Sequence, residues 1–206
     1  MQFWFDDDKR LQAAKQFQHQ RIEFLKRIWG KDRDLKGEGF DCDSCAIQGA
    51  LQNCSDKIDA ADRVVRLLQA EAELTKRLYR FAANATGYGD FTREREAVDT
   101  ANGFLNHGNY LAYGLAATTL WVLGIPHGFA VMHGKTRRGA LVFDIADLIK
   151  DAIVLPWAFI CAKEKATEQE FRQQCLQAFT DHKALDFMFN QLKQVALKTD
   201  WEIVHG

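Results

Sequence analysis

The sequence predicts an all-α protein. Helix-period patterns of apolar residues cover most of its 206 residues, and only two prolines, Pro126 and Pro156, interrupt them. The β-branched residues are scattered and form no run with the two-residue alternation of a strand. A chain of this length with 47% hydrophobic residues can bury one substantial core. We therefore expect a single helical domain over residues 1–206.

The first half of the chain predicts three helices. An amphipathic pattern over residues 5–28 ends at Gly30, and residues 31–41 are polar, hold two glycines and predict a flexible connection. A short helix around residues 44–53 then precedes a long, strongly periodic one over residues 56–84. Gly87 is expected to end the long helix, and a charged connection follows it.

The second half predicts a long central helix and two further helical regions. Residues 100–123 are apolar almost all round, as expected of a helix that others enclose. One polar line runs along it, and buried amides of this kind often bond to neighbouring backbone: Asn102, Asn106, Asn109 and Tyr113. A helix over residues 144–162 and a last helical region over residues 167–197 complete the chain.

Charge and hydropathy give few indications of function. The chain has 27 basic and 28 acidic residues, so no net field attracts nucleic acid, and any DNA binding must depend on local patches. No stretch reaches the ~18 apolar residues of a membrane span, and the acidic start lacks the order of a signal peptide. We expect a cytoplasmic protein with no membrane contact.

Glu71 is the most informative residue in the sequence. On a helical wheel it falls in the apolar arc between Leu67 and Leu74, whereas Glu73 lies roughly 160° away among charged residues. An ionised carboxylate in apolar surroundings costs several kcal/mol unless a cation, a metal or good donors meet it. A partner Arg or Lys from another helix explains Glu71 as well as a metal does.

Three further residues could complete a metal site. Asp144 and Asp147 form an i, i+3 carboxylate pair, and His133 opens a basic loop that holds Lys135, Arg137 and Arg138. One imidazole with two or three carboxylates suits Mg²⁺ or Mn²⁺, which support metal-assisted phosphoryl transfer. The alternatives are simpler: Asp144 as a helix N-cap, Asp147 as a first-turn charge, His133 as a hydrogen-bonded loop residue and a solvated basic loop.

The cysteines indicate a weaker alternative. Cys42 and Cys45 have the spacing of half a zinc site, and Cys54 could add a third thiolate. No second pair of this kind follows, so free thiols are the simpler interpretation, and a small thiol or zinc regulatory domain is a third hypothesis.

Three segments carry a family resemblance: Asn106-His-Gly-Asn-Tyr-Leu-Ala-Tyr113-Gly, Val131-Met-His133-Gly and Leu141-Val-Phe-Asp144-Ile-Ala-Asp147-Leu-Ile-Lys150-Asp151. In this order they resemble the catalytic domain of the CRISPR adaptation integrases, the Cas-one (Cas1) family, and are most similar to the subtype I-F branch. Glu71 fits the place of the family's catalytic glutamate, although Ala72 follows it where many members have glycine.

The resemblance implies a role for each candidate residue. Glu71, His133 and Asp147 would ligate Mg²⁺ or Mn²⁺, and Asp144 would be a fourth ligand or an acid behind the ligands, so that all four are catalytic. Lys135, Arg137 and Arg138 would contact DNA phosphates. Asn106 and Tyr113 would support the site from its edge.

The family resemblance also implies an activity and partners. Family members join the 3′-hydroxyls of a short duplex prespacer to the CRISPR repeat, in complex with the Cas-two (Cas2) protein or, in subtype I-F, its helicase-nuclease fusion. They dimerise largely through a β-rich N-terminal domain, which this sequence lacks, so we expect weak activity and an uncertain oligomeric state. The competing hypothesis is a non-catalytic helical scaffold of the adaptation complex, whose acids serve only as caps and salt bridges.

Overall fold

A computed structural model describes residues 6–96, 99–133 and 139–196, except for the side chains of Cys45 and Ala46. These residues form α-helices and one π-helical turn, η2, and contain no β-strand, which confirms the predicted all-α class. The elements are α1 (Asp7–Trp29), α2 (Arg33–Gly37), α3 (Cys45–Asp59), α4 (Val64–Thr86), α5 (Thr100–Val122), α6 (Ala140–Ile149), η2 (Lys150–Val154), α7 (Leu155–Lys163), α8 (Glu168–Asp181) and α9 (Ala184–Ala196).

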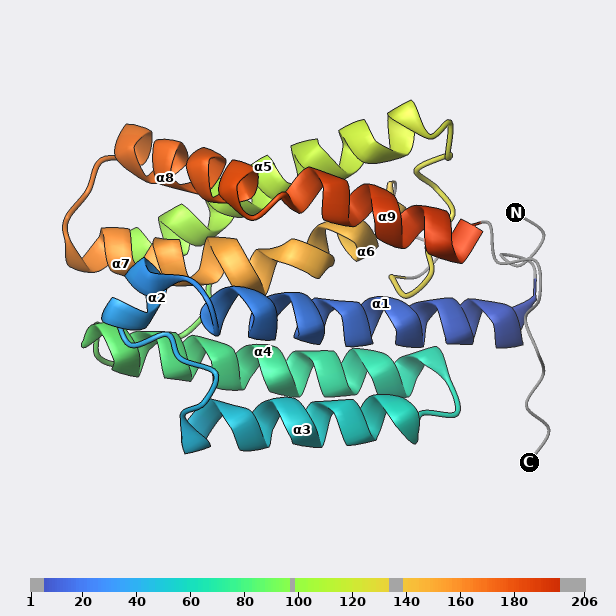
Figure 1. The fold of residues 1–206 in the computed structure, drawn as a ribbon, viewed down its shortest axis with the longest axis horizontal. Coiled ribbons are helices and arrows are strands. Elements are labelled where there is room, and N and C mark those ends of the chain that lie inside the picture. Colours follow the sequence, from blue (N-terminus) through green and yellow to red (C-terminus); the bar gives the residue numbers. More distant parts are fainter. Residues whose placement is uncertain (1–5, 97–98, 134–138, 197–206) are drawn as a thin grey trace.

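The helices stack in successive layers (Figure 1). The antiparallel pair α3 and α4 forms the lowest layer, and α1 lies on α4. The continuous run of α6, η2 and α7 packs on the other side of α1, and α5, α8 and α9 cover that run. Both faces of the middle run are therefore buried, and Asp144, Asp147 and Asp151 are all less than a tenth exposed.

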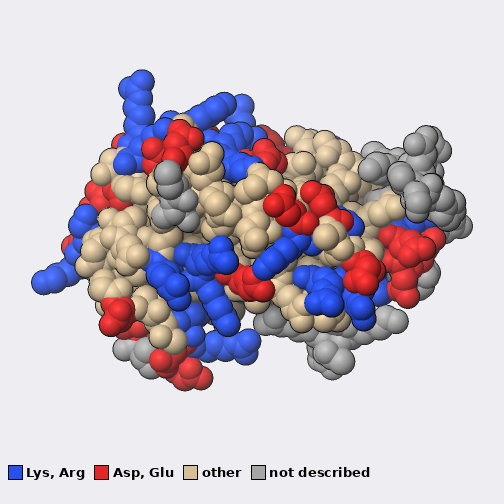
Figure 2. All heavy atoms as spheres, turned by 90° about the horizontal axis from the view of Figure 1, so that it is seen from below, with Lys and Arg blue, Asp and Glu red and all other residues tan. Residues whose placement is uncertain are grey.

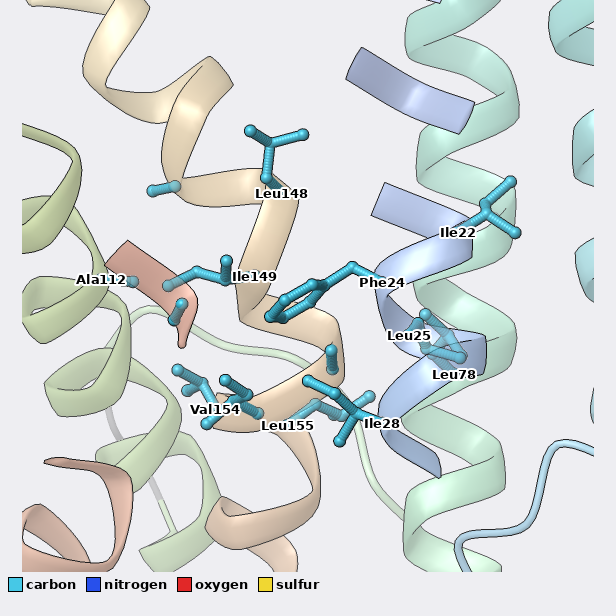
Figure 3. Packing of buried hydrophobic residues seen from close by; sticks show 14 of the residues in the cluster. Ile22, Phe24, Leu25, Ile28, Leu78, Ala112, Leu148, Ile149, Val154 and Leu155 are labelled. Carbon is cyan, nitrogen blue, oxygen red and sulfur yellow. The ribbon is translucent and has the colours of Figure 1, made fainter. Parts of the chain in front are cut away.

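The core joins residues from every layer. Phe24 of α1 points toward Ile149 of α6, and Ile28 of α1 points toward Leu155 of α7, as Figure 3 shows. Burial of such side chains is the main favourable term for the fold, worth about 2 kcal/mol for each large aliphatic group. The same packing fixes α1 against the segment that carries the buried aspartates.

The long helix predicted over residues 56–84 is wrong at its start. Residues up to Asp59 belong to α3, the chain reverses, and α4 begins at Val64. The apolar period continues through the reversal because both helices bury one face, so periodicity alone does not show the break. Val65, an apolar residue of the first turn of α4, is 57% exposed. Gly87 ends α4 in the left-handed conformation, as predicted.

The other helix ends differ from prediction for local reasons. The helix predicted from residue 144 begins at Ala140, and η2 interrupts it just before Pro156, which has no N–H to donate to an α-helical carbonyl. The predicted region over residues 167–197 starts with a capping box at Thr167 but breaks after Asp181, where Lys183 has a positive φ. Tyr110 and Trp121 are exposed on α5, so other helices enclose it on one side only.

The polar segment over residues 31–41 has more structure than predicted. It contains α2, and it buries Leu35 and Phe40 completely, with Phe40 packed edge-on against Trp29. These two apolar residues anchor the segment to the core; its flexibility stays a prediction. No helix in the described part of the chain is long and apolar enough to cross a membrane.

Candidate metal centre

Three predicted site residues converge from different parts of the chain. Glu71 of α4, His133 of the segment after α5 and Asp147 of α6 each offer a ligand atom, and these atoms all lie within 4.8 Å of one another. They form the one group of three or more potential metal-ligating side chains found among the described residues. The set consists of one imidazole nitrogen and two carboxylates, which suits a hard or borderline divalent ion.

Glu71 lies on the inner side of α4, as its place on the helical wheel predicted. Its side chain is 15% exposed, and its Oε2 atom is buried without a hydrogen-bond partner. The guanidinium of Arg21 lies 3.6 Å from Oε1. Burial, and next the charge of Asp147, raise the pKa of Glu71 to about 7. The predicted cation partner therefore exists, but it leaves half of this carboxylate unsatisfied.

Asp144 holds the His133 segment in place. Its carboxylate accepts hydrogen bonds from the backbone N–H groups of Val131, Met132 and His133, at 2.7, 3.1 and 3.2 Å. It also lies 2.6 Å from His133 Nδ1. With that nitrogen bound to Asp144, Nε2 is the atom that faces Asp147, at 3.9 Å. Carboxylates commonly orient metal-binding histidines in this way.

The simpler explanations, Asp144 as a helix N-cap and Asp147 as a first-turn charge, are wrong. Because α6 begins at Ala140, Asp144 and Asp147 lie in its second and third turns and are both 4% exposed. Interior carboxylates at these positions cannot satisfy the free N–H groups of the helix start. His133 is a hydrogen-bonded histidine, and Asp144 raises its pKa through that bond, against the opposing effect of burial.

Sequence reasoning missed two cations in the site, the buried Arg21 and the half-buried Lys150. Lys150 pairs with Asp147, while Arg21 pairs with Asp151 and donates to Thr75 at 2.8 Å and Gln18 at 3.1 Å. Burial opposes ionisation of Asp147, but Lys150 and Arg21 outweigh it and keep its pKa below the usual value. Arg21 has helical spacing with Phe17, Leu25 and Ile28, and this signal could have placed it on the buried face of α1.

The π-helical turn places two of these charges. Lys150 and Asp151 both lie in η2, so that Lys150 reaches back to Asp147 while Asp151 faces α1. Single π-helical turns of this kind are frequent at functional sites. A small cavity of about 80 Å³ lies beside them, lined in part by Arg21, Glu71, Asn109 and Asp147.

The two predicted supporting residues have different surroundings. Tyr113 lies at the site, with Lys150 Nζ 5.6 Å from its ring centre. Asn106 instead accepts from Arg93 and donates to the carbonyl of Arg95 at 2.9 Å, so it holds the connection before α5. That connection forms one wall of a groove of about 1170 Å³ along α4, and Glu71 and His133 lie on the lining of the same groove.

Other predicted residues lie outside the cluster or outside the described residues. Lys135, Arg137 and Arg138 belong to the segment 134–138, which the structure does not describe. Cys42 and Cys54 are buried free thiols whose Sγ atoms lie near the carbonyls of Leu25 and Ala70, respectively. Burial raises the pKa of Cys42 to about 12 and that of Cys54 to about 11. Thiols that ionise so poorly are weak zinc ligands.

The fold and the cluster together define a helical domain with a histidine–carboxylate centre between α4 and α6. Sequence comparison identifies its family: the profile of "CRISPR associated protein Cas1" matches residues 1–193. The chain is 52% identical over 199 residues to the CRISPR-associated endonuclease Cas1 of Pseudomonas aeruginosa (strain UCBPP-PA14). It is 54% identical over 198 residues to that of Pectobacterium atrosepticum. The chain belongs to the Cas1 family, as its motifs predicted.

The chain spans only part of these relatives. The two matches cover 96% and 95% of this chain but 61% of each relative's length. Solved structures share the fold at low identity. A Cas1 protein from Thermotoga maritima is 16% identical with a TM-score of 0.70, over 96% of this chain and 69% of that one. A casposase bound to its integration product is 13% identical with a TM-score of 0.68, over 96% and 64% of the respective chains.

Proposed function

We propose that this chain is the metal-dependent DNA endonuclease and integrase domain of a Cas1 protein in CRISPR spacer acquisition. Its reaction would join prespacer 3′-hydroxyls to the CRISPR repeat. The observation that carries the proposal is the convergence of Glu71, His133 and Asp147 within 4.8 Å, with Asp144 orienting the imidazole. Membership of the Cas1 family, with relatives that are named endonucleases, supports the same activity.

The charges of the site fit a bound divalent cation. Four carboxylates, those of Glu71, Asp144, Asp147 and Asp151, adjoin the two cations Arg21 and Lys150 among the described residues. With His133 neutral, the cluster has a formal charge of −2, and buried charge of one sign is costly. One Mg²⁺ or Mn²⁺ ion would neutralise it and give Glu71 Oε2 the partner that it lacks.

Each residue then has a defined role. Glu71, His133 Nε2 and Asp147 would hold the ion, and Asp144 would keep His133 in the tautomer that leaves Nε2 free. When bound, the ion stabilises the developing charge on the phosphate and lowers the pKa of the attacking oxygen. Lys150 and Arg21 are tied to Asp147 and Asp151, so they fix the carboxylates against mutual repulsion. Tyr113 would pack against this edge of the site.

Double-stranded DNA is the proposed substrate, both as prespacer and as CRISPR repeat. The groove along α4 that reaches Glu71 and His133 is also lined by Lys76, Arg80 and Arg93. Figure 2 shows Lys and Arg side chains gathered in the middle of the face seen from below. Cations near a metal site suit phosphate contacts, and we propose that Lys135, Arg137 and Arg138 add to them. A Cas1 protein with 22% identity and a TM-score of 0.59 was solved as a DNA complex, over 85% of this chain and 65% of that one.

The proposed partners follow from the family. They are Cas2 or its helicase-nuclease fusion, and a second Cas1 copy in the full-length protein, in the cytoplasm of a prokaryotic cell. Because integration needs two active sites on one duplex, we expect these 206 residues alone to join strands weakly. A non-catalytic scaffold stays the alternative: in that case the acids would serve structure only, and no metal would be needed.

A pair of matched variants tests the proposal. Glu71→Gln should reduce Mn²⁺-dependent DNA cleavage by at least ~100-fold, because replacing even an outer partner of a metal ligand costs about 10–100-fold. Glu73→Gln should leave cleavage unchanged, since Glu73 is exposed and pairs only with Lys57 among the described residues. Gel assays of a labelled duplex with Mn²⁺ or with EDTA measure both. Equal losses in the two variants, or cleavage that EDTA does not affect, would reject the metal mechanism.

A further inference from the structure

Gln18 of α1 is a buried amide that contacts two side chains at the edge of the candidate metal centre. It is 3% exposed, and both of its polar atoms have partners. Oε1 accepts from Arg21 Nη1 at 3.1 Å, and Nε2 donates to Met132 Sδ at 3.1 Å. The oxygen must face Arg21, because a guanidinium offers only donors. The amide therefore lies between the cation beside Glu71 and the segment that carries His133.

The guanidinium of Arg21 divides its donors between several acceptors. Nε and Nη2 donate to Asp151, and Nη2 also donates to Thr75 at 2.8 Å. The remaining nitrogen, Nη1, donates to Gln18 Oε1 at 3.1 Å. Glu71 Oε1 lies 3.6 Å from the same nitrogen, which is longer than a hydrogen bond. Nη1 is therefore bonded to the neutral amide and not to the carboxylate beside it.

The carboxylate of Glu71 would be the stronger acceptor for Nη1. When both partners are charged the hydrogen bond is short, about 2.7–2.9 Å, and Coulomb attraction adds to it. A movement of about 0.8 Å would bring Nη1 from its present 3.6 Å to that distance from Glu71 Oε1. Gln18 is the hydrogen-bond partner that Nη1 has among the described residues, so its oxygen opposes this movement.

We propose that Gln18 is a positioning residue that holds Arg21 away from Glu71 and so leaves this carboxylate free to bind the divalent ion. The inference rests on the proposed metal-dependent function and names a residue that sets the metal affinity of the same site. Without the amide oxygen, Nη1 loses its buried acceptor and the guanidinium closes on Glu71 Oε1. The resulting ion pair competes with the metal for the carboxylate, and the nearer positive charge repels the ion.

The nitrogen end of the amide offers a different route to the site, through the segment that carries His133. It bonds to the sulfur of Met132, and a thioether is a weak acceptor. The segment is already held by Asp144, which accepts from three consecutive backbone N–H groups. Loss of the bond to sulfur should therefore disturb His133 little. The oxygen of Gln18, which faces Arg21, carries the effect on the metal.

Gln18→Leu tests the role of the oxygen. It removes the acceptor, so the dissociation constant for Mn²⁺ should rise by about 10-fold, as is common when a partner behind a metal ligand is lost. Gln18→Met, which keeps the length of the side chain, should have the same effect and replaces the leucine variant if that one packs poorly. Electron paramagnetic resonance of free Mn²⁺ measures the dissociation constants at a fixed pH.

Two control variants separate the two ends of the amide. Gln18→Glu keeps an acceptor for Arg21 and should bind Mn²⁺ at least as tightly as the wild type. Met132→Leu removes the sulfur and leaves the amide oxygen in place, so the dissociation constant should change by less than about twofold. Binding weakened equally in Gln18→Leu and Gln18→Glu, or in Gln18→Leu and Met132→Leu, would overturn the proposal.

Urea denaturation in EDTA at pH 8 tests the contact without metal. If Gln18→Leu lets Arg21 close on Glu71, then Glu71→Gln removes an ion pair in that background. Glu71→Gln should therefore raise the urea midpoint less in the Gln18→Leu background than in the wild type, so that the two effects are not additive. Additive effects would overturn the role of Gln18 even if the wild type binds Mn²⁺. A wild type that binds no Mn²⁺ would instead reject the proposed metal function, and the comparison in EDTA would still decide whether Gln18 restrains Arg21.

Discussion

At the residue scale, Glu71 shows how a buried carboxylate costs stability. Its ordinary pKa is 4.5, and burial followed by the charge of Asp147 raises the pKa to about 7 in the fold. Because this pKa is higher in the folded state than in the unfolded state, protonated Glu71 favours the fold. Its contribution to stability is fully present below pH 4.5 and is lost as the pH rises through 7. At pH 8 the ionised form therefore costs the metal-free fold about 3 kcal/mol.

We therefore predict that Glu71→Gln stabilises the metal-free protein at pH 8. The neutral amide removes the buried charge, and the free energy of unfolding should rise by up to about 3 kcal/mol. The gain should vanish near pH 4, where Glu71 is protonated in both states. Urea denaturation in EDTA at the two pH values measures it, with Glu73→Gln as the exposed control. A destabilised Glu71→Gln at pH 8 would mean that the ion pair with Arg21 outweighs the cost of burial.

At the element scale, close packing between α5 and η2 holds the π-helical turn. Gly108 lies where α5 passes over Val154 and Phe171, and a Cβ atom there would approach them to 2.4 and 3.0 Å. The same turn carries Lys150 and Asp151, which pair with Asp147 and Arg21. Displacement of η2 would therefore move charges at the site as well as apolar side chains.

Gly108→Ala should destabilise the protein despite the better helix propensity of alanine. Overpacking typically costs about 1–3 kcal/mol, which exceeds the roughly 1 kcal/mol gained by removing a helical glycine. Gly114→Ala on the same helix should have the opposite sign, because its Cβ meets open space. Thermal and urea unfolding of the two variants measure these changes in stability. Equal changes in the free energy of unfolding would show that η2 moves to accommodate the new methyl group at no cost.

The helices themselves were largely predictable from sequence, whereas several of their ends were not. The phase of α4 placed Glu71 inward and Glu73 outward, because local periodicity determines which face a residue occupies. The break between α3 and α4 was missed, since both helices bury one face and the apolar period continues across Ala61. The start of α6 at Ala140 was missed too, and with it the burial of Asp144.

At the scale of the whole molecule, the site depends on contacts between residues far apart in the sequence. Arg21 meets Asp151 across 130 positions, and no local pattern pairs them. The residue types of Glu71, His133, Asp144 and Asp147 indicated a possible metal site, but only the resemblance to the Cas1 family chose Glu71, His133 and Asp147 as its ligands. The cations Arg21 and Lys150, which those arguments did not assign to the site, become evident only when α1 packs against η2.

A bound metal ion should raise the stability of the whole chain. If the cluster binds a divalent ion as proposed, it does so only in the folded state, because unfolding separates the ligands, so the ion should stabilise the fold by mass action. At 100 times its dissociation constant, Mn²⁺ should add about 2.7 kcal/mol, which raises the melting temperature of a chain of this size by roughly 5–10 °C.

The rise in melting temperature that Mn²⁺ causes should be larger at pH 8 than at pH 6. His133 and Glu71 both have raised pKa values and must lose their protons to bind the ion. Asp147→Asn should abolish the shift, while Glu73→Gln should keep it in full. Differential scanning calorimetry with Mn²⁺, and again after addition of EDTA, measures these effects. An equal rise for wild type and Asp147→Asn would place the ion elsewhere, and no rise at any pH would favour the scaffold alternative.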